Sequence, residues 1–269
     1  MNNQAKLNES FEKLAKGYRK LNKKQQEFAI REIGRIRGDL ADMLADYSAK
    51  DGTIKRQRLA RLLRELDEME MLVREYGTTS LDAIVKESAE FGSTGANAAI
   101  VAAIRSGALS EATIERINRD VFEYATKRLG DDGLVLSDRV WRFGGDMRDE
   151  LSKVLRADII RGESVSTMIA NIRKVYENET WKIRRLVVTE GNTAYRAAIS
   201  MSADRSDVVK GVRLHRGAAN VPSHRCTILS LEDRYGMGEG VFKSTDTEIY
   251  HPHINCTSFL TYELYDKYL

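Results

Sequence analysis

Apolar residues recur at helical spacing along the first part of this chain. Five of them are separated by alternating steps of four and three residues, which places them on one stripe of a helix. We call this stripe the N-terminal seam, and it consists of Leu7, Phe11, Leu14, Tyr18 and Leu21. The apolar periodicity continues to Tyr47, breaks at Asp51-Gly52 and resumes until Tyr76-Gly77. The pattern predicts helices over residues 7–47 and 53–76, joined as an antiparallel hairpin.

The N-terminal seam presents more apolar surface than a single helix leaves in contact with water. It either packs inside a helical bundle formed by this chain or docks on another helical protein. The pattern favours the bundle, but a seam of this length also suits an oligomer contact or a partner surface.

More helices are predicted downstream from their start and stop signals. Ser110 and Ser137 are suitable N-caps, and Gly130 and Gly162 follow helical segments at the position where glycine commonly ends a helix. A stretch of small apolar residues between glycines predicts one short buried helix. These elements are expected over residues 96–105, 111–129, 137–161, 164–176 and 181–200.

After residue 205 the chain becomes rich in turn residues and β-formers. Strands are predicted over residues 207–215, 240–243 and 258–262, which are short enough to form one small sheet. The predicted fold class is therefore mostly α: a long N-terminal helical hairpin or bundle, followed by a small α+β part. We place the boundary between a helical region, 1–135, and a C-terminal domain, 136–269.

The amino-acid composition says less about the function of the protein than the apolar pattern says about its fold. The net charge of the 269 residues is only +3, which gives no general case for nucleic-acid binding. Residues 1–40 carry ten basic and five acidic side chains. This local positive charge either forms a solvated helix face or binds phosphate groups or an acidic partner. No apolar run approaches the length of a membrane span, and no secretory signal is evident, so we expect a protein made in the cytoplasm, without a membrane partner.

Histidine and cysteine are concentrated at the end of the chain. The potential ligands are His224, Cys226, His251, His253 and Cys256, in two short clusters. Thiolate and imidazole are the ligands that zinc prefers, so four of these residues could hold a zinc ion. The other interpretation is that the histidines brace two turns by hydrogen bonds while both cysteines are simply buried.

Three segments resemble a known family. The segments are RRLVVTEGNTAYRAA (184–198), SHRCTIL (223–229) and HPHINC (251–256). Their order and the gap between the last two are similar to the pattern in phage head morphogenesis proteins of the Mu-F-like minor head family. The resemblance covers residues 140–262. It implies a structural virion protein that binds the portal protein, with other capsid or scaffolding proteins and packaged DNA as further partners and a role in assembly or DNA ejection.

The chain departs from the family pattern at the metal-type residues. Leu229 and Ile254 replace two of the four cysteines that the family carries, and His253 replaces an asparagine. Either His224 and His253 take over as ligands, or the metal is lost and Leu229 packs against Ile254. The apolar replacements favour the loss, so no cofactor is expected, with zinc as the alternative. Both accounts predict that Cys226 and Cys256 lie close together.

The segment 184–198 also carries a polar group on an apolar helix, formed by Arg185, Thr189, Glu190 and Asn192. Buried polar groups need partners, and we expect Arg185, Glu190 and Asn192 to bind the turn 251–256 and the whole group to brace the fold rather than to catalyse a reaction. No catalytic residue is assigned. The alternative function is a metal-dependent nuclease or toxin effector carried by a phage, with His251 or His253 as the base and Glu190 as a metal ligand.

Overall fold

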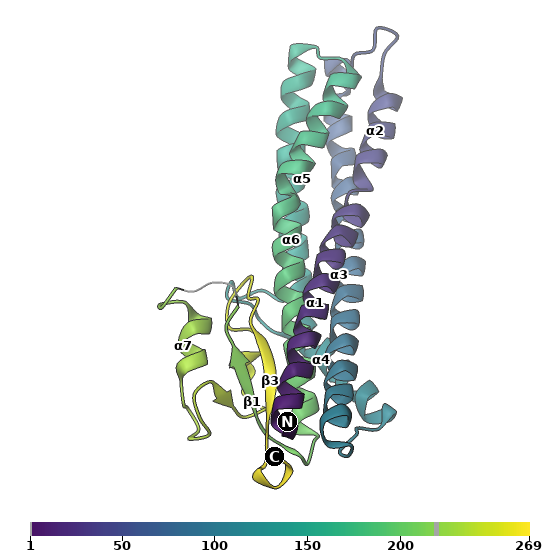
Figure 1. Cartoon of the computed structure of the whole chain (residues 1–269). Coiled ribbons are helices and arrows are strands. Elements are labelled where there is room, and N and C mark those ends of the chain that lie inside the picture. Colours follow the sequence, from purple (N-terminus) through teal and green to yellow (C-terminus); the bar gives the residue numbers. More distant parts are fainter. Residues whose placement is uncertain (1, 218–220) are drawn as a thin grey trace. The chain divides into compact units, whose positions relative to one another are not determined.

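The computed structural model describes residues 2–217 and 221–269, and it is mostly helical with a small antiparallel sheet near the C-terminus. This confirms the predicted fold class. The helices are α1 (Asn3–Ile33), α2 (Ile36–Tyr47), α3 (Leu59–Ile104), α4 (Glu111–Lys127), α5 (Leu136–Arg161), α6 (Val165–Asp204) and α7 (Arg225–Leu231). The strands are β1 (Val209–His215), β2 (Val241–Phe242) and β3 (Phe259–Leu264), and they are labelled in Figure 1 where room allows.

The chain divides into two compact units. Unit 1 comprises residues 1–26, 82–133 and 185–269, and unit 2 comprises residues 27–81 and 134–184. Both units draw on both sides of residue 135, so a boundary at that position does not separate them. The interpretation of 1–135 as a region that docks the portal or another partner, and of 136–269 as a domain similar to that of Mu-F-like head morphogenesis proteins, stays a prediction.

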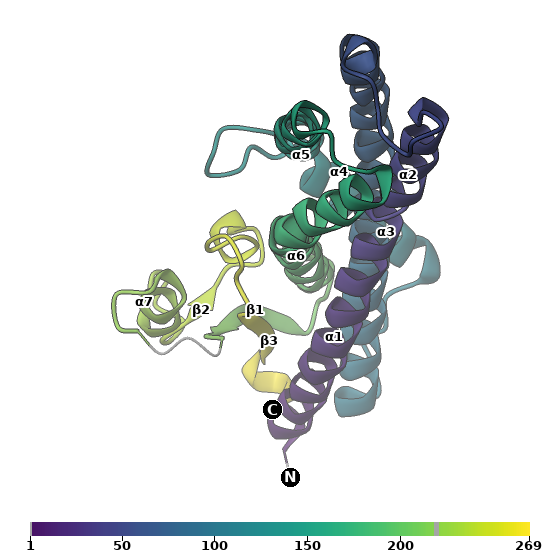
Figure 2. The same ribbon diagram turned by 90° about the horizontal axis from the view of Figure 1, so that it is seen from above.

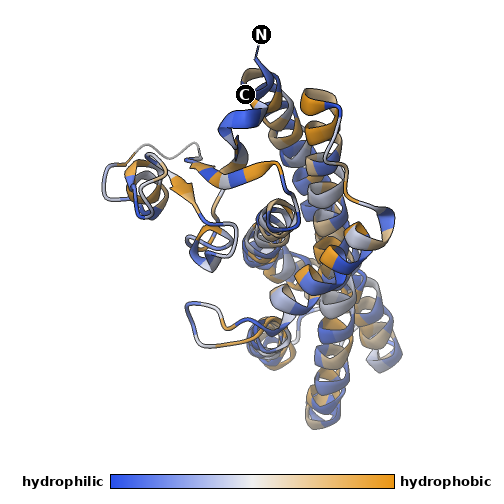
Figure 3. Ribbon diagram, turned by 90° about the horizontal axis from the view of Figure 1, so that it is seen from below, coloured by the Kyte–Doolittle hydropathy of each residue, from blue (hydrophilic) through white to orange (hydrophobic). Residues whose placement is uncertain are grey.

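Unit 1 contains the sheet, in the strand order β2-β1-β3 with both pairs antiparallel. Most positions of the strands are buried, and their apolar residues are interrupted by polar ones; Figure 3 colours the ribbon by hydropathy. Helix α1 covers the outer edge of β3. There the Gln4 side chain donates to the Tyr262 carbonyl and accepts from the Leu264 amide. Pairing an edge strand in this way removes its unsatisfied backbone groups. Figure 2 shows α1 on the β3 side of the sheet and α7 on the β2 side.

The N-terminal seam is mostly buried within unit 1. Leu7 and Phe11 are 0% exposed and Tyr18 is 2% exposed. Phe11 lies 4.5 Å from the Tyr262 ring, and Tyr18 stacks on Tyr195 of α6 at 3.9 Å between ring centroids. Three of the five seam residues are therefore packed internally, as the preferred interpretation expects, while Leu14 and Leu21 are partly buried; docking on a partner stays a prediction.

Glycines within α3 allow close packing and do not end the helix. The prediction of one helix ending near Tyr76 and a second over 96–105 was wrong, because α3 is continuous for 46 residues. A Cβ on Gly92 would lie 2.8 Å from the Tyr195 backbone oxygen, and one on Gly95 would overlap Leu14 Cδ1. These positions are small because another helix occupies the space. Likewise α6 is one helix of 40 residues, where two were expected.

Replacing Gly92 with alanine tests this explanation. We expect the variant to lose about 1–3 kcal/mol of unfolding free energy, because the added methyl group overlaps the backbone of α6. Gly38→Ala is the matched control: Gly38 is helical and has open space around it, so alanine there should stabilise by roughly 0.5–1 kcal/mol. Urea unfolding of both variants measures the two changes, and a neutral Gly92→Ala would contradict close packing.

The hairpin turn and the end of α5 in unit 2 agree with the prediction, whereas Ser137 was wrongly predicted as an N-cap, because α5 already begins at Leu136. Gly52 adopts a left-handed φ of 75° in the turn between α2 and α3, and Gly162 ends α5 with a φ of 72°. The predicted helix 7–47 is interrupted between Ile33 and Ile36. There the Arg35 amide bonds to the Glu32 carbonyl in a tighter turn, while the Ile30 carbonyl accepts from both the Gly34 amide and the Tyr176 hydroxyl.

Candidate functional site

One face of α6 holds the segment 250–258 in unit 1. Thr189, Thr193 and Arg196 are spaced four and three residues apart, so their side chains lie on the same face of the helix. The Thr189 hydroxyl accepts from the backbone amide of Asn255 at 3.0 Å, and the Thr193 hydroxyl lies 3.1 Å from His251 Nδ1. Asn255 has a φ of 63°, a left-handed conformation that asparagine tolerates better than most residues.

Arg196 is the centre of this contact. Its side chain is 0% exposed. Its Nε donates to the Tyr250 carbonyl at 2.9 Å, and its Nη1 donates to the carbonyls of Cys256 and Ser258 at 3.2 and 3.1 Å. A buried guanidinium with three backbone acceptors fixes the course of the segment around it.

The two cysteines meet next to Arg196. Cys226, on α7, and Cys256 are both buried, and their sulfur atoms are 3.1 Å apart, which confirms that they lie close together. Their mutual hydrogen bond is the main cause that lowers the pKa of Cys256 and raises the pKa of Cys226. The Arg196 charge lowers the pKa of Cys256 further, and burial raises that of Cys226. Of the two thiols, Cys256 is therefore the more acidic.

Two of the histidines join the cysteines. His253 Nε2 lies 2.9 Å from Cys226 Sγ, and its Nδ1 lies 2.7 Å from the Ile254 carbonyl. A hydrogen bond to Cys256 is the main cause that raises the pKa of His253. The His224 ring stands edge-on to the His253 ring at 4.2 Å between centroids. Ligand atoms of His224, Cys226 and His253 all lie within 4.8 Å of one another, a spacing that one metal ion could bridge. We call these three residues and Cys256 the His–Cys cluster.

His251 lies apart from this cluster. Its Nδ1 faces Thr193, and its Nε2 is 3.9 Å from a carboxylate oxygen of Asp131. Of the three histidines after residue 220, His253 contacts a cysteine sulfur, His224 lies beside His253, and His251 braces the turn against α6.

The apolar replacements differ in burial. Leu229 is 0% exposed on α7, whereas Ile254 is only partly buried. This difference gives little support to the prediction that the two side chains fill the place of a metal by packing on each other.

The member of the polar group on α6 that holds the 251–256 turn is Thr189, which was not among the three residues expected to bind it. Thr189 binds Asn255, as described above. The prediction was wrong for Glu190, whose carboxylate oxygens lie 3.0 and 2.8 Å from Arg128 Nη2, since position 190 is rotated around the helix from Thr189 and faces the end of α4. It was also wrong for Asn192, which donates back to the Val188 carbonyl of its own helix, and for Arg185, which lies one turn before Thr189 and is exposed.

Sequence reasoning missed Arg196 and Arg128. The signal for Arg196 was present, because a charged residue interrupts the apolar run TAYRAA (193–198) and a charge at such a position must be paired. Arg128 carried no comparable signal, since it follows the last turn of α4 in a charged stretch.

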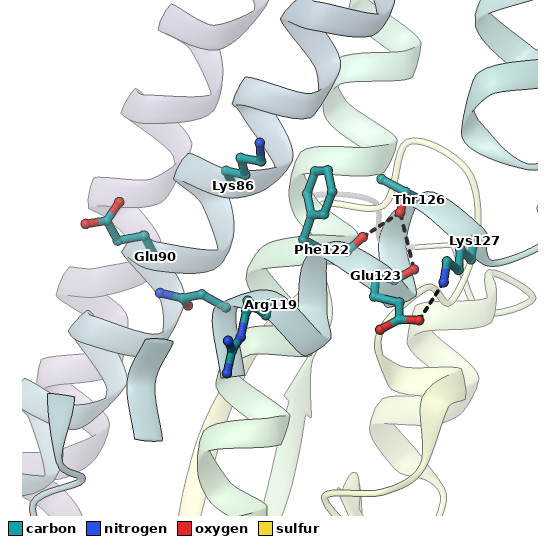
Figure 4. Close-up of a pocket in the computed structure, with 8 residues that line it drawn as sticks. Lys86, Glu90, Arg119, Phe122, Glu123, Thr126 and Lys127 are labelled. Carbon is teal, nitrogen blue, oxygen red and sulfur yellow. Dashed lines mark hydrogen bonds and ion pairs between the residues drawn. The ribbon is translucent and has the colours of Figure 1, made fainter. Parts of the chain in front are cut away.

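A separate groove in unit 1 lies between α3 and α4, with a volume of about 560 Å³ (Figure 4). Lys86 and Arg119 line it together with Glu90 and Glu123, so its charges are mixed. Figure 4 shows Lys127 pointing to Glu123, with 2.6 Å between the charged atoms. Because this groove has no dominant charge and no reactive group, the His–Cys cluster is the stronger candidate site.

Comparisons with known proteins gave no match: neither a protein-family model, nor a curated protein, nor a solved structure is significantly similar to this chain. Within the described residues, no helix is both long and apolar enough to cross a bilayer. The resemblance to minor head proteins therefore rests on the motif residues alone.

Proposed function

We propose that this chain is a structural component of a phage head, similar to the Mu-F-like minor head proteins. In this role it binds the portal protein during procapsid assembly, together with capsid or scaffolding proteins, and stays in the virion at the head interior or the portal region. The observation that supports the proposal is the convergence of the three resembling segments. Residues 184–198, 223–229 and 251–256 are far apart in sequence, yet Arg196 and the two cysteines join them at one point.

The surface of α1 supports contact with packaged DNA in the same role. A run of basic side chains on this helix is exposed: Lys13, Lys16, Arg19, Lys20, Lys23 and Lys24. Side chains of this kind neutralise phosphates without reading sequence, which suits a protein inside a DNA-filled shell and a part in packaging or ejection.

The exposed face of α7 is the portal-docking surface that we propose in place of the mostly buried seam. Ile228 and Leu231 are 43% and 63% exposed and lie three residues apart, on one side of the helix. Val221 and Tyr235, before and after α7, are exposed as well. An exposed apolar group of this kind marks a protein contact more often than it remains in water.

Affinity capture tests the proposal. The tagged full-length chain, expressed in prophage-induced cells, should retain the portal protein, as identified by mass spectrometry. The double variant Ile228→Lys, Leu231→Lys should retain about tenfold less portal, since each loss of roughly 1.4 kcal/mol of binding free energy lowers affinity tenfold. Thermal melting is the control for folding, and both substituted side chains are exposed, so the melting temperature should not change.

The possible results of the capture experiment distinguish the proposed function from the proposed docking surface on α7. Absence of portal from the wild-type capture would contradict the proposed function. Equal capture by wild type and the double variant would move the docking surface away from α7 while leaving the function in place.

The alternative, a metal-dependent nuclease or toxin effector, has one supporting feature: the His–Cys cluster. Its proposed carboxylate ligand is misplaced, however, because Glu190 faces Arg128. Incubation of the purified chain with plasmid DNA, with magnesium or zinc and then with a chelator, distinguishes the two functions. Chelator-sensitive cleavage would favour the nuclease.

A further inference from the structure

The His–Cys cluster has the donor set of a closed zinc site. Two thiols and two imidazoles are present: Cys226 and Cys256 with sulfurs 3.1 Å apart, His253 with Nε2 2.9 Å from Cys226, and His224 within 4.8 Å of both Cys226 and His253. Structural zinc is held by four such ligands in a tetrahedron, and a pair of short ligand motifs separated by a loop is its usual source. Here the motifs are His-x-Cys at 224–226 and His-x2-Cys at 253–256.

The tautomer of His253 is set for coordination. Its Nδ1 lies 2.7 Å from the Ile254 carbonyl, and a carbonyl oxygen can only accept, so Nδ1 carries the proton of this hydrogen bond. In the neutral ring, Nε2 then holds the free lone pair, and Nε2 is the atom that faces Cys226. A backbone carbonyl on the far nitrogen is the partner that metal-ligating histidines commonly have.

His224 supplies a second, independent observation. Its Nδ1 is buried and has no hydrogen-bond partner among the residues that the structure describes. A buried polar atom without a partner is costly, and one on a histidine whose ligand atom lies within 4.8 Å of Cys226 and His253 has an explanation if a cation binds there. Arg196 holds the carbonyls of Cys256 and Ser258 and so fixes the backbone that carries the fourth ligand.

We infer that His224, Cys226, His253 and Cys256 bind one zinc ion, which ties α7 to the segment 253–256. Two thiolates on a tetrahedral zinc lie about 3.8 Å apart, given zinc–sulfur bonds of about 2.3 Å. The sulfurs must therefore separate by several tenths of an ångström, which small side-chain rotations supply. All four positions come from the protein, so the site leaves no place for a reactive water, and its role is structural. The inference does not rest on the proposed function.

Metal analysis of the full chain, expressed with zinc in the medium and purified without chelators, tests the inference. We expect one zinc per chain by elemental mass spectrometry. Cobalt in place of zinc should give the visible ligand-field bands of a tetrahedral site and a charge-transfer band from thiolate. His253→Ala and Cys226→Ser should lower the zinc content about tenfold or more, since even residues that only orient a ligand change affinity by such factors.

His251→Ala is the matched control, because His251 belongs to the same turn but faces Thr193. This variant should keep the zinc and the cobalt spectrum. Circular dichroism establishes that each variant is folded, and melting of the wild type with and without chelator gives a readout that needs no variant. We expect the chelator to lower the melting temperature of the wild type and to leave that of His253→Ala unchanged.

Three results would overturn the inference. The first is wild-type protein without zinc and without a tetrahedral cobalt spectrum. The second is a disulfide between Cys226 and Cys256 in protein that was purified free of oxidant. The third is equal loss of zinc from the His251 and His253 variants, which would assign the effect to the turn as a whole.

Discussion

Replacing Arg196 with methionine should lower the free energy of unfolding by about 3–5 kcal/mol, because each buried acceptor left without a donor costs about 1–3 kcal/mol. Methionine preserves most of the volume but cannot donate, so the carbonyls of Tyr250, Cys256 and Ser258 lose the donor that Arg196 supplies. Part of this cost is offset, since a charge no longer has to be buried in a fully covered position.

Urea unfolding measures the change as a lower midpoint with an unchanged slope. Arg185→Met is the control on the same helix, and it should change stability by no more than about 0.5 kcal/mol because Arg185 is exposed. A second readout is local: Cys226 and Cys256 are buried in the wild type and should react faster with a thiol reagent in the Arg196 variant. Equal stabilities for the two arginine variants would contradict the role given to Arg196.

The helical part of this fold follows from local rules that the sequence displays. Ser110 was expected to cap α4, and its side chain accepts from the Thr113 amide. Gly162 was expected to end α5 and adopts the left-handed conformation there. All three strands were predicted near their observed positions, since alternation and β-forming residues are local properties.

The predictions from sequence were wrong where tertiary packing determines the course of a helix. Gly92 and Gly95 look like helix breakers in a local reading, but α3 continues through them because Tyr195 and Leu14 fill the space beside them. Near Gly34 the helix is interrupted where Tyr176, more than a hundred residues away, packs so closely that a Cβ on Gly34 would lie 2.9 Å from its hydroxyl. No local pattern contains such information, and only the packed structure provides it.

The candidate site could be predicted only in part, because its contacts also depend on tertiary packing. Proximity of Cys226 and Cys256 followed from the resemblance, and the structure places their sulfurs in contact. Residue types alone could not separate His251 from His253, because the two histidines are two positions apart and face different partners. Partners of buried charges were the least predictable, as Glu190 shows.

The pairing of Glu190 with Arg128 leads to the second large effect. Glu190 is 0% exposed, and the side chain of Arg128 is 6% exposed, so this ion pair is screened from water. Removing one member of a buried pair costs about 3–5 kcal/mol, because the remaining charge loses its counterion. We therefore expect Arg128→Met and Glu190→Met each to destabilise the protein by about that amount.

The double variant distinguishes an ion pair from two independent packing contributions. Replacing both members with methionine removes both buried charges at once, so the double variant should be less destabilised than the sum of the single variants by about 2–3 kcal/mol. Lys127→Met is the control, since the neighbouring Lys127–Glu123 pair is exposed and should contribute at most about 1 kcal/mol. Urea unfolding of the four proteins in the cycle gives the coupling. If the two single changes simply add, Arg128 and Glu190 stabilise the fold separately, and the buried ion pair does not connect the end of α4 to α6.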